Sequence, residues 1–254
     1  MFKLKGGRYA NNWEKWRAYR ASILHERPDV LHGHEALAYG ATLRKFPEFP
    51  RVLNPWGPDI ELLAVPGQPE EAKELVRHAL DAADLISTNA PGLEEHWSRL
   101  TGQPVSKFRF FSWGVDTTRF YPRDRRACAE LREWLGIPED APLVVSPRLA
   151  KPYYRVETIM RGWQRARKRG HLPPEARLAV LRAGADNPPW RKLLALKEEL
   201  ADETILLVDQ LLDEEAMARL YSTAQAMVMI PETDLLAASL LEGMACGCLP
   251  ILAD

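Results

Sequence analysis

The stretch PETDLLAASLLEGMACGCLPILAD, residues 231–254, places a short helix between two apolar runs. The runs at 226–230 and 249–253 have the length of buried strands. At about 100° per residue, a helix over 235–246 gathers most of its large apolar side chains on one face. These side chains are Leu236, Leu240, Leu241 and Met244, which share the face with Ala237. Glu242 falls on the opposite face among small side chains, where another molecule could come close. The pattern fits a solvated acid equally well, and periodicity alone leaves both interpretations open.

Short apolar strands alternate with helices along most of the chain, in two blocks. We expect strands at 29–32, 51–54, 84–88, 107–111, 143–146, 177–182, 204–208, 226–230 and 249–253. We expect helices at 12–27, 35–46, 69–81, 91–100, 125–135, 155–168, 189–201, 213–224 and 235–246. Two blocks of this kind predict two parallel sheets covered by helices. The predicted fold class is α/β, with two Rossmann-like domains whose parallel sheets face one another across a cleft.

Two stretches lack periodicity. Residues 113–122, WGVDTTRFYP, are interpreted as the connection between domains at 1–122 and 123–254. Residues 55–59, PWGPD, are expected to form a loop, because two prolines and a glycine interrupt regular structure.

Composition excludes several classes of function. The 254 residues suffice for one large or two ordinary domains. A formal net charge of −1 gives no basic field that would point to nucleic acid or an anionic membrane. The apolar runs are strand-sized, so no transmembrane segment is expected, and the N-terminus carries no signal-peptide core. Cys128, Cys246 and Cys248 form no zinc pattern and favour a reducing, cytoplasmic compartment.

Polar and aromatic residues follow the predicted strands. In open α/β sheets, ligands bind beyond the carboxyl ends of the strands. The residues just past those ends are His34, 56–59, Asn89, Trp113, Arg148, Lys151, 184–186, Gln210 and 232–234. Flat rings, cations and carboxylates together suit a sugar nucleotide. No GxGxxG, GxxxxGK[ST] or GxSxG motif supports a nicotinamide cofactor, a P-loop or a hydrolase elbow.

Three cations follow the first strand of the second domain. Arg148, Lys151 and Arg155 could converge on a diphosphate and stabilise its developing charge. Taken singly, Lys151 and Arg155 are better explained as surface cations.

Two small clusters could in principle hold a metal. His32 and His34 would share one face of a strand, but no third ligand is nearby, so a role for His34 alone is favoured. Glu232 and Asp234 imitate an acidic metal-binding signature, whereas Asp234 as a helix N-cap would also account for its place. No metal site is predicted.

The motifs together resemble one family, the retaining, two-Rossmann-domain (GT-B-type) glycosyltransferases of family 4. The similarity runs through nearly the whole chain, in DVLHGHEALAYG (29–40), NPWGPDI (54–60), ADLISTNAPGLEEHW (83–97), FSWGVDTTRFYP (111–122), SPRLAKPYYRVETIMRGW (146–163) and 231–254. The resemblance implies transfer of a sugar from a nucleotide-diphosphate donor, with retention of configuration and without metal or cofactor. The implied acceptor is an unknown carbohydrate, lipid-linked or small molecule, and a peripheral membrane contact is compatible with it.

The resemblance also implies roles for residues of the donor site. The family's paired acids, separated by seven residues, fall on Asp234 for the donor sugar and Glu242 for the ribose hydroxyls. Arg148 matches the arginine on the diphosphate. The companion lysine has no clean match, because PYYR replaces the usual PEKG, and Lys151 or Arg155 would substitute for it. Gly184 is placed with the donor-binding residues.

On the other domain, His34 matches the histidine beside the transferred sugar and the acceptor. Trp56, Gly57 and Asp59 would line the acceptor side.

The chain departs from the family pattern in two ways. The usual Glu-Gly-Phe-Gly is replaced by DLLA at 234–237, and the leucines are expected to narrow or reshape the sugar pocket that the resemblance implies. The family's first strand and glycine-rich loop should precede Asn12, and a further strand and helix should follow Asp254. Both domains are therefore expected to be incomplete. These departures keep open an alternative, a catalytically silent nucleotide-sugar-binding or interaction module. A metal-dependent transferase using Glu232 and Asp234 is a third hypothesis.

Overall fold

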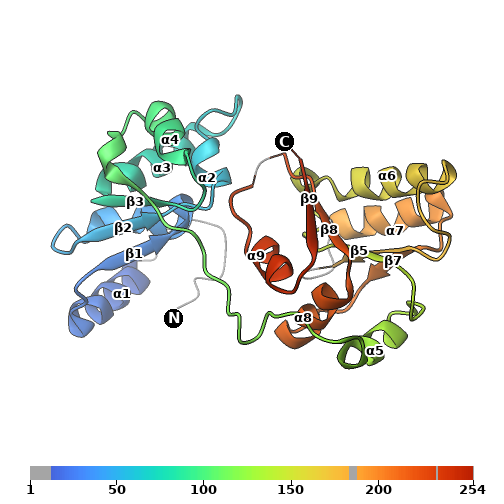
Figure 1. Ribbon diagram of the computed structural model, residues 1–254. Helices are drawn as coiled ribbons and strands as arrows, with labels where there is room; N and C mark the ends of the chain where they lie inside the picture. The colour runs from blue at the N-terminus through green and yellow to red at the C-terminus, as the bar shows by residue number, and fades with distance from the viewer. Residues whose placement is uncertain (1–12, 183–187, 233, 254) are drawn as a thin grey trace. The chain divides into compact units, whose positions relative to one another are not determined.

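A computed structural model describes residues 13–182, 188–232 and 234–253. The chain divides into two compact units, Met1–Phe110 and Phe111–Asp254. Each unit contains one parallel sheet with helices packed on it (Figure 1). None of the helices in the described ranges has both the length and the hydropathy needed to cross a membrane.

Unit 1 has a four-stranded sheet of order β1-β2-β3-β4 in which every pairing is parallel. The strands are β1 (Leu31–His34), β2 (Arg51–Asn54), β3 (Leu85–Thr88) and β4 (Phe108–Phe110). The helical segments are α1 (Trp13–Glu26), η1 (Glu35–Tyr39), η2 (Gly40–Lys45), α2 (Pro58–Glu61), α3 (Glu70–Ala82), α4 (Leu93–Thr101) and η3 (Val105–Lys107). Leu53, Ile86 and Val76 are fully buried between sheet and helices.

Four sequence-based expectations for unit 1 need correction. β1 begins two residues later than expected, because its pairing with β2 sets Leu31 opposite Arg51 and His34 opposite Asn54. The helix expected at 35–46 is a π-helical turn, η1, followed by a 3-10 segment, η2. The expected loop at 55–59 ends in the short helix α2, and α4 starts only after Gly92, whose φ of 80° interrupts helical geometry.

Unit 2 has a five-stranded sheet of order β7-β6-β5-β8-β9, again parallel at every pairing. The strands are β5 (Leu143–Ser146), β6 (Arg177–Leu181), β7 (Ile205–Val208), β8 (Ala226–Met229) and β9 (Leu249–Leu252). The helices are α5 (Arg125–Trp134), η4 (Pro152–Tyr154), α6 (Val156–Lys168), α7 (Pro188–Leu200), α8 (Glu214–Thr223) and α9 (Ala238–Ala245).

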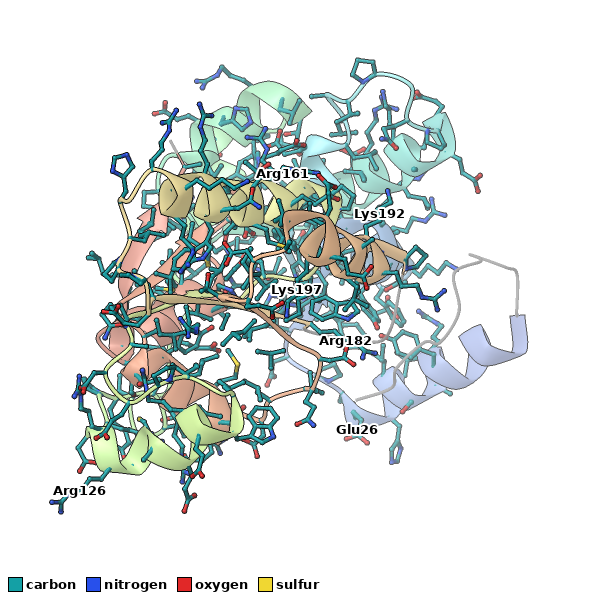
Figure 2. The ribbon with its side chains drawn as sticks, turned by 90° about the vertical axis from the view of Figure 1, so that its right-hand side faces the viewer. Glu26, Arg126, Arg161, Arg182, Lys192 and Lys197 are labelled. Carbon is teal, nitrogen blue, oxygen red and sulfur yellow. The ribbon has the colours of Figure 1, made fainter. Side chains whose placement is uncertain are left out.

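Helices cover both faces of this second sheet (Figure 1). α6 and α7 pack on one face around Met160, Leu178 and Trp190. Figure 2 shows these two helices side by side, with Arg161 on α6 and Lys192 and Lys197 on α7. α5, α8 and α9 pack on the other face. As the sequence predicts, Asp213 caps α8, and its carboxylate accepts the N–H of Ala216 at 2.8 Å.

The helix in the deciding stretch, α9, is shorter than expected and turned differently. It begins at Ala238, so Asp234 is not its N-cap. Its buried contact to the sheet is made at Gly243, where an added Cβ would lie 2.6 Å from the sulfur of Met227 in β8. Met244, predicted to face the core, is 52% exposed. The close approach at the glycine sets the orientation of α9 and therefore of Glu242.

Candidate functional site

The sheet topology of unit 2 brings Arg148 and Asp234 together. Arg148 follows the end of β5, Asp234 follows the end of β8, and these strands are neighbours. Nη2 of Arg148 lies 2.6 Å from Oδ2 of Asp234, and the two side chains are only 17% and 19% exposed. Burial raises the pKa of Asp234, and the charge of Arg148 and the N–H of Leu235 partly offset this. The site thus holds a shielded ion pair at the carboxyl ends of two strands.

Two further side chains hold the guanidinium of Arg148. Tyr154 lies beneath it, with the Arg148 Cζ 4.1 Å from the ring centroid. Nη2 also donates to the Tyr154 hydroxyl at 2.5 Å, and Nη1 donates to Oγ of Ser239 at 3.3 Å. Sequence reasoning missed Tyr154 as a site residue. The signal was present in PYYR, where an uncommon aromatic pair stands beside the predicted cation cluster.

Glu242 lies one turn after Ser239 on α9. Residues three apart share a side of a helix, so the contact between Ser239 and Arg148 places Glu242 on the Arg148 side of α9. The carboxylate is half-buried, and within the described residues it has neither a hydrogen bond nor an ion pair. Burial raises the pKa of Glu242, and the nearby charge of Glu214 raises it further. A partly desolvated carboxylate with unengaged oxygens can accept hydrogen bonds from a ligand.

The two other predicted donor-site cations have other partners than this pair. Arg155 has a left-handed φ of 52°, and its Nε lies 3.3 Å from Oε1 of Glu232. Nζ of Lys151 lies 5.6 Å from the ring centroid of Tyr153. In the part of the chain that is described, no hydrogen bond or ion pair joins either side chain to Arg148 or Asp234. Gly184 lies outside the described residues.

In unit 1, His34 is the last residue of β1 and stands beside His32 on the sheet. Their ring centroids are 4.3 Å apart. Burial and the neighbouring His34 lower the pKa of His32, so this imidazole is neutral at pH 7. Within the described ranges, no three His, Cys, Asp or Glu side chains gather as a metal would require.

Asp59 holds together the segments that carry His34 and Trp56. Its carboxylate is 5% exposed and accepts the N–H of Ala36 at 2.6 Å and the N–H of Trp56 at 2.9 Å. Burial raises the pKa of Asp59, and these backbone N–H groups oppose the rise. Each carboxylate oxygen accepts one of these backbone N–H groups. Asp59 therefore fixes the backbone at this end of the sheet. Trp56, by contrast, is 55% exposed and Gly57 has a φ of 95° in the turn before α2.

Replacing Asp59 with alanine is expected to destabilise unit 1 by about 2 kcal/mol, because one buried and one partly buried N–H group lose a charged acceptor. Amide hydrogen exchange would report this directly, with the N–H groups of Ala36 and Trp56 exchanging faster. The control is Asp84→Ala, which removes a 55% exposed carboxylate bonded to Arg51 and is expected to cost less than about 1 kcal/mol. Unchanged protection at both amides would contradict the assigned role of Asp59.

Comparison with known proteins agrees with this fold. No protein-family model matches the chain. The chain is 26% identical over 170 residues to D-inositol 3-phosphate glycosyltransferase of Xylanimonas cellulosilytica, which is 65% of this chain and 39% of that protein. Sucrose-phosphate synthase of Thermosynechococcus elongatus matches with a TM-score of 0.76 at 20% identity, over 98% of this chain and 64% of the other. HepE of Anabaena, solved with UDP-glucose, matches with a TM-score of 0.72 at 14% identity, over 92% and 62%.

The structural matches confirm the predicted fold class, two Rossmann-like α/β domains with parallel sheets, the fold type called GT-B. At these identities the likeness defines the fold and not the activity. The chain spans 39% of the length of the curated relative and less than two thirds of these solved chains.

Proposed function

We propose that this chain belongs to a glycosyltransferase that moves a sugar from a nucleotide-diphosphate donor to an acceptor. One observation carries the proposal. Arg148 after β5 is paired with the shielded Asp234 after β8, and α9, whose Ser239 contacts Arg148, carries on the same side Glu242, a carboxylate without a partner among the described residues. A glycosyltransferase among its relatives and the UDP-glucose bound to HepE support the same class of donor.

The three groups suit three parts of such a donor. Arg148 would bind the diphosphate and stabilise the negative charge that grows on it as the sugar leaves. The anionic diphosphate would replace Asp234 on the guanidinium, which frees the Asp234 carboxylate to accept hydroxyl groups of the sugar. Glu242 would accept the two ribose hydroxyls of the nucleotide.

Several finer features are part of the proposal. By resemblance, the enzyme is a family-4 transferase that retains the anomeric configuration without a metal ion. His34 and Trp56 are proposed to serve an acceptor that is a carbohydrate, a lipid-linked sugar or a small molecule. The buried free thiols Cys128, Cys246 and Cys248 are consistent with a reducing compartment, and we propose the cytoplasm.

Donor turnover tests the proposal. We expect the chain to bind UDP or GDP, and to hydrolyse or transfer from the matching nucleotide sugar at the same rate with and without a chelator. The anomeric proton of the product, followed by NMR, is expected to show the configuration of the donor. His34→Ala is expected to abolish turnover while nucleotide binding persists. Binding without any turnover would instead support a silent nucleotide-sugar-binding module, and activity lost to the chelator would contradict the metal-independent mechanism.

A further inference from the structure

The guanidinium of Arg148 is held by Asp234, Tyr154 and Ser239, and the two closest of these, Asp234 and Tyr154, would respond differently when an anion binds. Asp234 is an anion itself and occupies the position beside Nη2 that a diphosphate oxygen would take. Tyr154 contacts the same guanidinium through its ring face and its hydroxyl. A bound diphosphate would displace the carboxylate and leave the tyrosine in place.

Tyr154 is itself fixed by its surroundings. It is only 8% exposed and belongs to the core cluster between the sheet and α6, which includes Val156, Ile159 and Trp163. The ring of Tyr153 packs beside it with centroids 4.3 Å apart. The left-handed backbone of Arg155 then turns the chain directly into α6. The phenol ring therefore cannot swing away when Arg148 changes partner.

The chemistry of a phenol suits this place. Burial and hydrogen bonding with Tyr153 raise the pKa of Tyr154, so the side chain stays neutral. A neutral hydroxyl can accept an N–H of the guanidinium without competing for it as a counter-ion. The ring face stabilises the cation at the same time. An arginine left without such contacts would lose side-chain conformational entropy when it is fixed onto a ligand.

We propose that Tyr154 is a positioning residue that fixes Arg148 for the diphosphate of the donor, so that the guanidinium keeps its place as Asp234 gives way. The inference rests on the proposed function and deepens it. It assigns recognition of the diphosphate to a Tyr154–Arg148 pair in a chain whose PYYR segment lacks the lysine of the motif it resembles.

The test compares a nucleoside diphosphate with its nucleoside, using Tyr154→Phe, which keeps the ring and removes the hydroxyl. By calorimetry, this variant is expected to bind UDP more weakly by a factor of about 10 or more, as loss of one hydrogen bond to a charged group predicts. Uridine, which lacks phosphate, is expected to bind within twofold of wild type. GDP and guanosine replace this pair if the wild type prefers GDP.

The chain supplies a matched control on another surface of unit 2. Tyr121 makes a similar contact, with the Arg123 Cζ 4.5 Å from its ring centroid and Nη1 donating to its hydroxyl at 3.1 Å. Tyr121→Phe is expected to leave both affinities unchanged.

The possible outcomes separate the inference from the proposed function. A wild-type chain that binds neither UDP nor GDP would overturn both. If the wild type binds and Tyr154→Phe binds the diphosphate equally well, only the inference fails. An equal loss for diphosphate and nucleoside would show a general structural effect and would also overturn it.

Discussion

Glu242→Ala is expected to weaken the binding of UDP or GDP about 100-fold, measured by calorimetry. The carboxylate is half-buried on α9, on the side where Ser239 contacts Arg148, and its oxygens have no hydrogen-bond partner among the described residues. Two hydroxyl groups bonded to one carboxylate contribute about 3 kcal/mol together, which corresponds to this factor. In wild type, affinity is expected to fall as the pH drops through the raised pKa of Glu242, because the protonated group is a poorer acceptor.

Glu242→Ala is expected to weaken nucleotide binding without destabilising the fold. The pKa of Glu242 is raised in the folded chain, so above that pKa its ionised form costs folding free energy. Removing the group is therefore expected to leave the free energy of unfolding at pH 7.5 unchanged or higher.

Glu199→Ala is the control for the affinity measurement. Glu199 is an exposed acid on α7 paired with Arg161 at 2.8 Å, and its loss is expected to leave affinity unchanged. Affinity of Glu242→Ala within twofold of wild type would rule out its role at the ribose.

Arg148→Met is expected to lower the free energy of unfolding by about 3 kcal/mol at pH 7.5, because it leaves the carboxylate of Asp234 shielded and unpaired. The deficit has a defined pH dependence. Burial raises the pKa of Asp234, and loss of Arg148 raises it further, so the cost is full above that pKa and shrinks as the pH falls. Denaturant unfolding at several pH values measures it.

A double variant separates the ion pair from other effects of losing Arg148. Adding Asp234→Asn removes the unpaired charge, so Arg148→Met with Asp234→Asn is expected to recover most of the lost stability. The comparison pair is Arg161 and Glu199, with side chains 52% and 61% exposed, whose disruption is expected to leave stability nearly unchanged. Strictly additive losses at Arg148 and Asp234 would refute a coupled pair.

The alternation of strand and helix predicted most of the fold because it reflects local physics. The strand predictions at 51–54 and 143–146 match β2 and β5 residue for residue, since short apolar runs between polar turns have few other stable conformations. The errors fall where tertiary contacts override local preference. The turn after His34 is π-helical, and the carboxylate of Asp59, 23 residues away, accepts the N–H of Ala36 at its start.

The candidate site was predicted in part. The positions of Arg148, Asp234 and Glu242 follow from strand ends and from the family resemblance, both visible in the residues. The role of Tyr154 could not be predicted from the sequence, because a tyrosine in a loop is most simply explained as a packing residue. Only the tertiary structure shows the guanidinium of Arg148 over its ring. Asp59 was predicted as an acceptor-side group. Only the structure shows that its carboxylate is bonded to two backbone N–H groups and so fixes the local backbone.

Residues 231–254 show where the division lies. By itself the sequence determined a strand, a helix and a strand in the order of a Rossmann-like unit, together with two acids at a defined spacing. The tertiary structure decided that Asp234 is bonded to Arg148 instead of capping α9, and that Gly243, packed on Met227, orients the helix bearing Glu242. Periodicity reports which residues prefer burial, whereas the pairing of charges and the rotation of a helix depend on the side chains that neighbouring strands bring against it.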